Sequence, residues 1–491
     1  MKYIFQKIMK QSYVFRLLFL FIFTFALIAS SGRAINSQTI LAQNFLNTNY
    51  DSNYYGKMLE ADRFYKQGDL QTAKKIQEEV KPNFEPPEAI PAAQSEIEQL
   101  DATAQQQWTS AQKAIAEDPE SDEDIDLRIF EPLESLVDNN PQFVPGHILL
   151  ADTYDLYGNE DEALNTIEWS AQRYPGRDDI LDKRIELLIA YGKPLEASIA
   201  AREFAYNYPD FPKSSAYRAA ADEYFQEYQK QLKSKVATST IIGGIGQAAS
   251  GDSEAGLNLG QALLEGESGV GLALANDYKA QKAVVTDSKQ LQYITEIGQK
   301  LADLMGRNEF TYEFNIIEDP SPNAVALPGG KIFFHTGMLQ LMNSEAELAG
   351  VMSHEIAHSV LSHGYKKLGE SAITGSTSSL LSGLIGGDAG KVVELGGVLL
   401  NKEFGRDKEK QADVLGLRVL AAAGYSADGL YNVMAKLNQL ESSSGLEDSL
   451  LSSHPAPADR MEYLEELIQT RGYNRYGYEG VEAYQAVFPK Q

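Results

Sequence analysis

The residues best suited to chemistry are the five from His354 to His358, which read His-Glu-Ile-Ala-His. On a helix, two histidines four positions apart lie on one face about 6 Å from each other, so two imidazole nitrogens can reach one Zn2+. Glu355 lies beside them and can act on a water molecule bound to that metal. These residues therefore predict a helix that carries a zinc site able to activate water.

A third ligand decides which kind of zinc site this is. A site with glycine three residues and histidine six residues after the second histidine is excluded, because Leu361 and Gly364 hold those positions. Glu409 and Asp413 lie four residues apart on a second expected helix. One carboxylate can thus bind the metal while the other braces a ligand histidine. Two histidines and a carboxylate leave a fourth position open, as in hydrolytic zinc sites.

Composition narrows the remaining choices. The 491 residues include no cysteine, which excludes disulfides, thiolate ligands and cysteine nucleophiles. With 43 Lys and Arg against 69 Asp and Glu, the formal charge is −26, and no basic block is present. Nucleic acid is therefore excluded as the main partner, because phosphate binding needs a concentrated basic face.

Four motifs, in this order, resemble the gluzincin metalloprotease family, which includes the CAAX prenyl protease, HtpX, the Oma-type protease and BepA. They are Asn323-Ala-Val-Ala-Leu-Pro-Gly-Gly330, His354-Glu-x-x-His358, Glu409-x-x-Ala-Asp413, and His454-Pro455 with Arg460. The resemblance begins near Asp277 and runs to the C-terminus. It implies an endopeptidase with one Zn2+ per chain, ligated by His354, His358 and Glu409, and with Glu355 as catalytic base.

Other residues gain expected roles from the same resemblance. His454 is expected to donate a hydrogen bond to the oxyanion, but it can instead ligate the zinc and keep the enzyme latent, or be structural. Asn323 and Ala324 are expected to contact substrate. Residues 331–335 are expected to form a strand, either an edge strand that pairs with an extended substrate or a core strand. His363 is interpreted as structural rather than as a ligand.

Upstream of these motifs, several features recur every 34 residues, and they predict helical repeats. The recurring residues are Pro141, Pro175 and Pro209, Gly158 and Gly192, and Ala163 and Ala197. Glycine ends one helix, alanine lets the next pack closely, and proline stops it. The pattern resembles the tetratricopeptide repeat, with three to five helix pairs, and a plain helical bundle is the alternative. Such stacks bind protein segments on a concave surface.

The N-terminus resembles a secretory signal, because basic residues precede the apolar run 17–29, which is short for a membrane span. Cleavage is expected near Ala34 or Ala42. Two stretches, 241–274 and 372–400, are rich in glycine yet aliphatic. The first is expected to be a linker with an amphipathic helix, or a segment that contacts a membrane or the next domain. The second is expected to be a lid or plug over the site, or a membrane-touching hairpin.

Together these features predict a mainly α protein with a small β-sheet. The expected order is a signal peptide (1–42), a tetratricopeptide-like solenoid (54–230), a Gly-rich linker (231–276) and an α+β zincin-type domain (277–491). The predicted function is an exported zinc endopeptidase of the periplasm or extracytoplasmic membrane surface, acting on protein substrates in envelope quality control. The repeats would recruit substrates or envelope complexes, with peripheral membrane contact. The alternative is a repeat-based envelope scaffold or chaperone with a latent protease domain.

Overall fold

The computed structural model describes residues 52–84, 86, 90–117, 126–242, 266–373, 404–444, 454 and 457–490. The predicted signal peptide, residues 243–265 of the first Gly-rich stretch and residues 374–400 of the second lie outside these residues. In the described part of the chain, no helix has both the length and the apolar character needed to cross a membrane.

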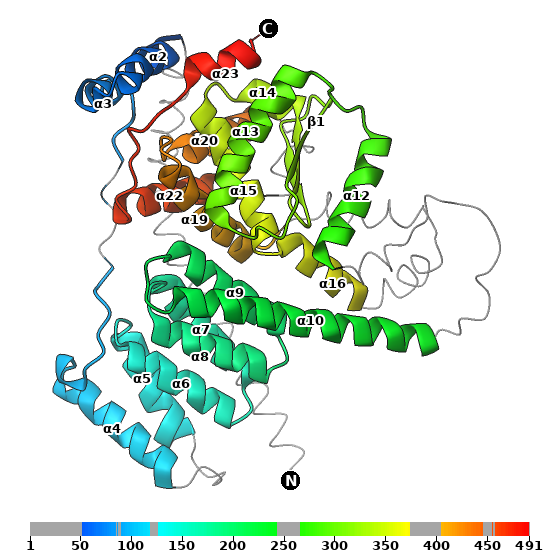
Figure 1. Cartoon of the computed structure of the whole chain (residues 1–491). Helices are drawn as coiled ribbons and strands as arrows, with labels where there is room; N and C mark the ends of the chain where they lie inside the picture. Colours follow the sequence, from blue (N-terminus) through cyan, green and yellow to red (C-terminus); the bar gives the residue numbers. More distant parts are fainter. Residues whose placement is uncertain are drawn as a thin grey trace.

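The helices of the predicted repeat region pack in pairs (Figure 1). They are α4 (Ala102–Glu117), α5 (Glu131–Asn139), α6 (Val144–Leu156), α7 (Glu160–Arg173), α8 (Asp178–Ala190), α9 (Pro194–Asn207) and α10 (Ser214–Ile242), with a short turn η2 (Asp126–Phe130) before α5. Gly158 and Gly192 turn the chain inside two successive pairs with φ of 74° and 67°, which glycine adopts at little cost. Ala163 and Ala197, near the start of the second helix of each pair, are fully buried. The paired helices thus follow the 34-residue spacing.

The C-terminal part contains one small mixed sheet of order β1-β3-β2. The strands are β1 (Glu313–Ile317), β2 (Ala324–Leu327) and β3 (Lys331–His335). β3 runs parallel to β1 and antiparallel to β2, and it is buried along its whole length. Residues 331–335 are therefore a core strand, and the edge-strand alternative for them is wrong, because both sides of β3 are already paired. The strand that ends the sheet toward the site is β2, which packs on α15 (Glu345–Val360).

Helices surround this sheet, with α15 at the centre (Figure 1). The others are α12 (Glu267–Gln281), α13 (Ser288–Met305), α14 (Thr336–Leu341), α16 (His363–Ile373), α19 (Arg406–Ala422), α20 (Gly429–Ser444), α22 (Pro457–Thr470) and α23 (Val481–Val487). Ser344 caps α15 by accepting a hydrogen bond from the backbone N–H of Glu347, as the sequence pattern predicts. Gly416 of α19 faces the backbone of His354, and a Cβ there would lie 3.0 Å from His354 N. Glycine therefore lets α19 lie directly against the helix of the two histidines.

The last repeat helices pack on this C-terminal domain. Leu195 and Ile199 of α9, and Phe225 of α10, belong to the same buried apolar cluster as α12, α13 and α15. α9 also packs directly against α19. The paired helices are thus joined to the domain through a shared core.

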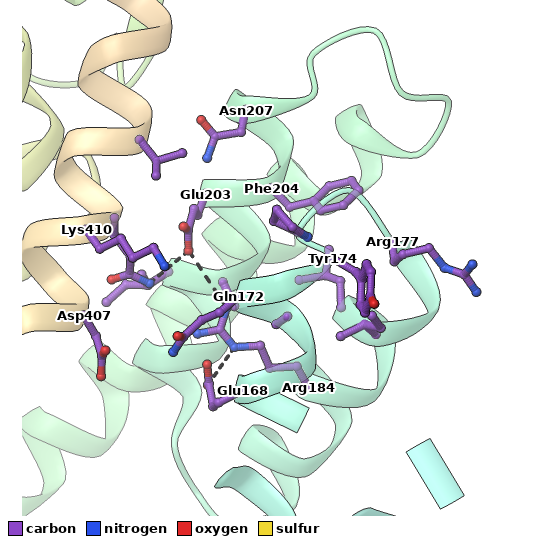
Figure 2. Close-up of a pocket in the computed structure, with 18 of the residues that line it drawn as sticks. Glu168, Gln172, Tyr174, Arg177, Arg184, Glu203, Phe204, Asn207, Asp407 and Lys410 are labelled. Atoms are coloured by element: carbon purple, nitrogen blue, oxygen red, sulfur yellow. Dashed lines mark hydrogen bonds and ion pairs between the residues drawn. The ribbon is translucent and has the colours of Figure 1, made fainter. Parts of the chain in front are cut away.

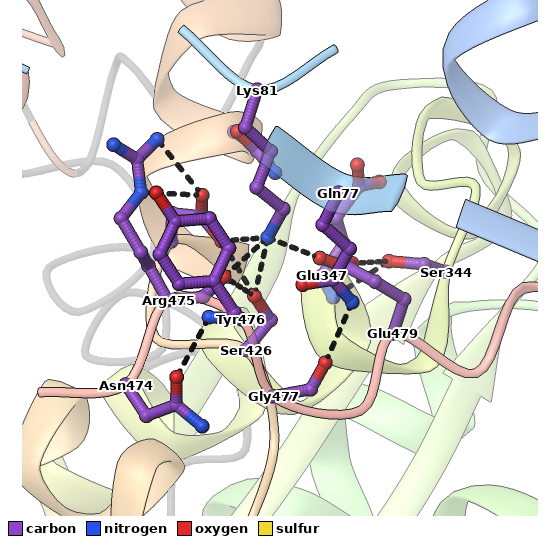
Figure 3. A network of polar contacts seen from close by, with 12 residues as sticks. Gln77, Lys81, Ser344, Glu347, Ser426, Asn474, Arg475, Tyr476, Gly477 and Glu479 are labelled. Carbon is purple, nitrogen blue, oxygen red and sulfur yellow. Dashed lines mark hydrogen bonds and ion pairs between the residues drawn. The ribbon is translucent and has the colours of Figure 1, made fainter. Parts of the chain in front are cut away.

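The first hairpin, α2 (Ser52–Lys66) and α3 (Leu70–Glu78), lies apart from α4–α10 and beside α23 (Figure 1). Asp62 accepts hydrogen bonds from the backbone N–H groups of Glu479 at 3.0 Å and Val481 at 2.9 Å. Shortly after α3, the buried Lys81 ammonium donates to Glu479 at 2.6 Å (Figure 3). The predicted repeat segment 54–230 is therefore divided in space, because the polar groups of its first hairpin find their partners in the C-terminal domain.

Candidate metal centre

Four side chains from three parts of the chain converge on one buried point. They are His354 and His358 of α15, Glu409 of α19, and His454, and each offers a donor atom within 4.8 Å of the others. The Nε2 atoms of His354 and His358 lie 3.1 Å apart. Glu409 Oε2 lies 3.6 Å from His354 Nε2, and Glu409 Oε1 lies 3.5 Å from His358 Nε2. The helical i, i+4 spacing and the second helix thus bring the three predicted ligands together.

His454 lies within hydrogen-bonding distance of two of the three predicted ligands. Its Nδ1 atom lies 2.9 Å from both carboxylate oxygens of Glu409 and 3.3 Å from His354 Nε2. Its Nε2 atom lies 3.7 Å from Glu355 Oε1. Burial lowers the pKa of His454 to about 4, so its ring is neutral and able to donate a lone pair. In this arrangement His454 is a fourth candidate ligand.

Asp413 orients His354 from behind. Its Oδ1 atom lies 2.7 Å from His354 Nδ1, so the proton of that neutral ring sits on Nδ1 and the lone pair on Nε2 faces the cluster. Arg460 of α22 donates to both oxygens of Asp413, at 2.7 and 2.9 Å, and its Nη1 lies 3.1 Å from Glu409 Oε2. Although burial alone would raise the pKa of Asp413, Arg460 and His354 hold it well below the ordinary value. Tyr463 also donates a hydrogen bond to Asp413.

His363 reaches the cluster as a neighbour of His358, not as a ligand. Its Nδ1 atom lies 2.9 Å from His358 Nδ1, on the side of that ring away from the other ligands. The chain can place it there because α15 ends at Val360 and Ser362 takes a φ of 57°, which turns the chain back. Phe404 stacks on the His358 ring, with the two ring centroids 4.4 Å apart. Sequence reasoning missed Phe404, which no motif marks.

The donor set fits a metal ion. The Nε2 lone pair of His354 faces Nε2 of His358 at 3.1 Å, and burial lowers the pKa of both rings, which are therefore neutral. Both oxygens of Glu355 are buried, and no side chain of the described residues donates a hydrogen bond to them. Two imidazole nitrogens with a carboxylate form a donor set that Zn2+ prefers, and an unpaired carboxylate beside it has a natural partner in a metal-bound water. A bound cation would account for each of these features.

The surroundings of Glu355 shift its pKa toward neutral pH. Burial raises its pKa to about 7, with Glu409 adding to the shift and His454 opposing it. The backbone amide of Ala326 in β2 also lowers the pKa, which places the carboxylate beside that strand. A carboxyl group with a pKa near 7 can both take up and release a proton at neutral pH.

The predicted substrate-contact residues lie at the start of β2. Ala324 is fully buried, backbone included, in this conformation. Asn323 is half-buried, and its side-chain oxygen has no hydrogen-bond partner within the described residues. His335 has a different environment, because it contacts the Tyr278 hydroxyl at 2.9 Å and the Ser321 hydroxyl at 2.8 Å. Within the described part of the chain, these two hydroxyl groups, and not the metal cluster, are the hydrogen-bond partners of the His335 ring.

Comparison with known proteins points to one family. Residues 288–468 match peptidase family M48. The chain is 29% identical over 180 residues to the mitochondrial metalloendopeptidase OMA1 of Schizosaccharomyces pombe, which covers 36% of this chain and 52% of that protein. It is 23% identical over 252 residues to the beta-barrel assembly-enhancing protease of Escherichia coli, covering 48% and 52%. It is 32% identical over 154 residues to OMA1 of Arabidopsis thaliana, covering 31% of each.

These matches account for one part of the chain. The chain spans about half the length, or less, of the curated relatives named here. The matched residues 288–468 hold all four converging donors, Glu355 and Asp413. The paired helices α4–α10 lie upstream of this match. Residues 288–468 therefore resemble peptidase family M48 and contain the buried His-His-Glu-His cluster.

Proposed function

We propose that this chain is a zinc-dependent endopeptidase that cleaves protein substrates, with His354, His358 and Glu409 as its metal ligands. The observation that carries the proposal is the convergence of these buried donors beside Glu355, whose carboxylate receives no hydrogen bond from a side chain of the described residues. Bound Zn2+ would supply a polarised water and a Lewis acid for the peptide carbonyl. Protein substrates are the substrates that the matched protease family implies.

In this proposal, Glu355 moves the proton. Its carboxylate accepts a proton from the attacking water and returns it to the nitrogen of the leaving peptide. The pKa of about 7 suits both steps, because neither protonation state is strongly favoured at neutral pH. Asp413 and Arg460 keep the His354 ring in the tautomer that a ligand needs.

The outer backbone edge of β2, the side that pairs with no strand in the described part of the chain, is the proposed substrate platform. β2 packs on α15 and brings the Ala326 amide close to Glu355. An extended substrate that pairs with this edge would lie along the two histidines, bound by main-chain hydrogen bonds rather than by side-chain pockets. Asn323 and Ala324 begin this edge, with the free Asn323 amide oxygen as a further contact.

We also propose that His454 keeps the enzyme latent in the conformation seen here. With Nδ1 2.9 Å from Glu409 and 3.3 Å from His354 Nε2, His454 completes a four-donor set and takes the position that water needs. Activity then requires His454 to leave the cluster. This geometry favours the latent alternative over the role of oxyanion donor.

Cell-envelope quality control is the proposed setting, with the paired helices α4–α10 as tetratricopeptide-like repeats that recruit substrates or envelope complexes. The N-terminal signal pattern and the recurring 34-residue features support this setting. The beta-barrel assembly-enhancing protease of Escherichia coli is a relative whose name refers to envelope assembly. The rival proposal, a repeat-based scaffold with a latent protease domain, draws its support from the four-donor arrangement of His454.

Two variants test the proposed activity. Glu355→Gln is expected to retain zinc and lose cleavage of fluorescein-labelled casein, because the proton carrier is gone while the ligands remain. Glu409→Ala is expected to lose zinc as well, measured by elemental analysis of the purified chain. Both are made in the wild-type chain and in a His454→Ala background, with the exposed Glu296→Gln as control. Unchanged cleavage by Glu355→Gln would refute the mechanism.

The scaffold proposal needs a separate test. A deletion strain is complemented with wild type, Glu355→Gln or Glu409→Ala, and the envelope phenotype is scored. An enzyme predicts that both variants fail to complement, whereas a scaffold predicts that both succeed.

A further inference from the structure

A chain of hydrogen bonds leads from the candidate ligand His358 to the last repeat. His358 Nδ1 lies 2.9 Å from His363 Nδ1, at the first step. His363 Nε2 lies 3.1 Å from the side-chain oxygen of Gln411, which is on α19. Gln411 Nε2 in turn donates to Glu203 Oε2 at 2.9 Å, and Glu203 belongs to α9. Four side chains thus connect the repeat segment to the metal cluster.

The direction of these hydrogen bonds follows from the chemistry of the last group. A carboxylate can only accept, so Gln411 turns its NH2 group toward Glu203 and its carbonyl oxygen toward His363. That oxygen accepts from His363 Nε2–H, which leaves His363 Nδ1 without a proton. His363 Nδ1 then accepts from His358 Nδ1–H. The lone pair of His358 is therefore on Nε2, the atom that faces His354.

Glu203 is held in place at the wall of a cavity between the repeats and α19. The cavity has a volume of about 290 Å³, and Figure 2 shows Glu203 directed from α9 toward α19. Arg184 Nη1 lies 3.9 Å from Glu203 Oε2. Burial raises the pKa of Glu203, and the charge of Arg184 and the hydrogen bond from Gln411 both oppose that shift. In the contact with Gln411, Glu203 is the acceptor.

We propose that Glu203 and Gln411 are positioning residues that act through His363 to hold the Nε2 lone pair of His358 toward the metal. The repeat segment would then be part of the metal centre, since one end of the hydrogen-bond chain lies on α9. This inference rests on the proposed function only in taking His358 as a ligand. The tautomer of His358 is set by the hydrogen bonds themselves, so it can be measured in the metal-free chain.

The first measurement is the tautomer of His358. The full chain contains six histidines, so ¹⁵N-histidine labelling gives six rings to resolve after chelator treatment. Ring-nitrogen shifts of the wild type are expected to place the His358 proton on Nδ1. In Gln411→Leu the acceptor for His363 is lost, and in Glu203→Gln an amide that can donate or accept replaces a group that only accepts. Both variants are expected to shift His358 toward a mixture of tautomers.

The second measurement is zinc affinity by competition with a chromophoric chelator. Gln411→Leu is expected to weaken binding by about 10–100-fold, the range typical of residues that orient a ligand. Glu203→Gln is expected to weaken it less, by about twofold if half of the molecules hold the wrong tautomer. Glu168→Gln is the matched control, because Glu168 lines the same cavity and bonds Arg184 at 2.7 Å but has no place in the chain of hydrogen bonds.

A swapped pair separates orientation from simple structural damage. In Glu203→Gln/Gln411→Glu the charge is unchanged, the new carboxylate accepts from His363, and the new amide donates to it. The swap is expected to recover the wild-type tautomer and most of the zinc affinity. The proposal is overturned if the His358 tautomer is unchanged in Gln411→Leu, or if the swap is no better than Glu203→Gln. A tautomer shift in a chain that binds no zinc would support the positioning role and refute the proposed function.

Discussion

Lys81 links the N-terminal hairpin to the C-terminal domain through buried ion pairs. Replacement of Lys81 by methionine tests how much these contacts contribute to the free energy of docking of the hairpin. Its Nζ lies 2.8 Å from Asp428 Oδ1 and 2.6 Å from Glu479 Oε1, and all three side chains are 1% exposed. The same ammonium donates to Ser426 Oγ at 2.6 Å and to the carbonyl of Arg475 at 2.5 Å (Figure 3). Methionine is similar in length, so Lys81→Met removes the charge with little change in volume.

The expected loss in the free energy of docking depends on the buried carboxylates that remain after Lys81 is replaced. Removing one partner of a buried ion pair costs about 3–5 kcal/mol, because the other charge remains buried without compensation. Asp428 keeps Arg475 at 3.3 Å, which limits its share of the loss. Glu479 loses the cation that lowers its pKa. We therefore expect a loss of about 3 kcal/mol in the free energy of docking of α2–α3 at pH 8.

The destabilisation caused by Lys81→Met should increase as the pH rises. Burial raises the pKa of Glu479 from 4.5 to about 7 even with Lys81 present. A carboxyl whose native pKa lies above its unfolded value stabilises the folded state at low pH, and this contribution disappears as the pH rises from about 4.5 to about 7. At pH 5 Glu479 is protonated and leaves no unpaired charge in Lys81→Met. The variant is thus expected to be less destabilised at pH 5 than at pH 8.

Amide hydrogen exchange in α2 and α3 measures this docking directly. A loss of about 3 kcal/mol corresponds to exchange about 150-fold faster, after correction for the intrinsic pH dependence. Lys57→Met is the control, because Lys57 pairs with Glu79 at 2.9 Å at the surface, with side chains 33% and 56% exposed. Equal acceleration in the two variants, or an effect of Lys81→Met that is the same at pH 5 and pH 8, would refute the reasoning.

Three further substitutions probe the metal centre. His454→Ala is expected to retain zinc and raise the rate of casein cleavage, because it opens the fourth ligand position; a slower rate would instead favour the oxyanion role. Asp413→Asn is expected to weaken zinc binding by about 10–100-fold in chelator competition, because the group that holds His354 Nδ1–H is no longer a pure acceptor. Gly416→Leu is expected to lower the free energy of unfolding in urea by about 1–3 kcal/mol, because its side chain meets the backbone of His354. A Gly416→Leu variant as stable as wild type would show that α15 and α19 can separate without cost.

The parts of the site that could be predicted from sequence are those fixed by local geometry. His354 and His358, and Glu409 and Asp413, are each four residues apart on a helix, and helical periodicity alone puts each pair on one face. The pairing of the repeat helices follows from the 34-residue spacing in the same way. The order of the strands could not be predicted in this way, because the sequence pattern of a strand does not indicate which other strands pair with it. The apolar run from Ile332 to Phe334, which does not alternate with polar residues, was nevertheless a signal of burial on both faces.

The contacts that could not be predicted join residues that are far apart in the sequence. Lys81 meets Glu479 across 398 residues, and Gln411 meets Glu203 across 208. Sequence periodicity does not predict contacts of this kind, because they depend on how whole helices pack against each other. The resemblance to a protease family did not supply them either, because its motifs begin after the repeats and neither Lys81 nor Glu203 belongs to a motif.

The contact between α9 and α19 limits how the paired helices could serve the proposed endopeptidase. α19 carries Glu409 and Asp413 on the side that faces α15, and it carries Gln411 toward Glu203 of α9. A substrate held at the far end of the stack, on α4–α6, leaves this contact in place. A ligand that entered the cavity and parted α9 from α19 would draw Glu203 away from Gln411 and release the His358 ring. Substrate binding on α4–α6 is therefore compatible with an ordered metal centre, whereas binding between α9 and α19 is not.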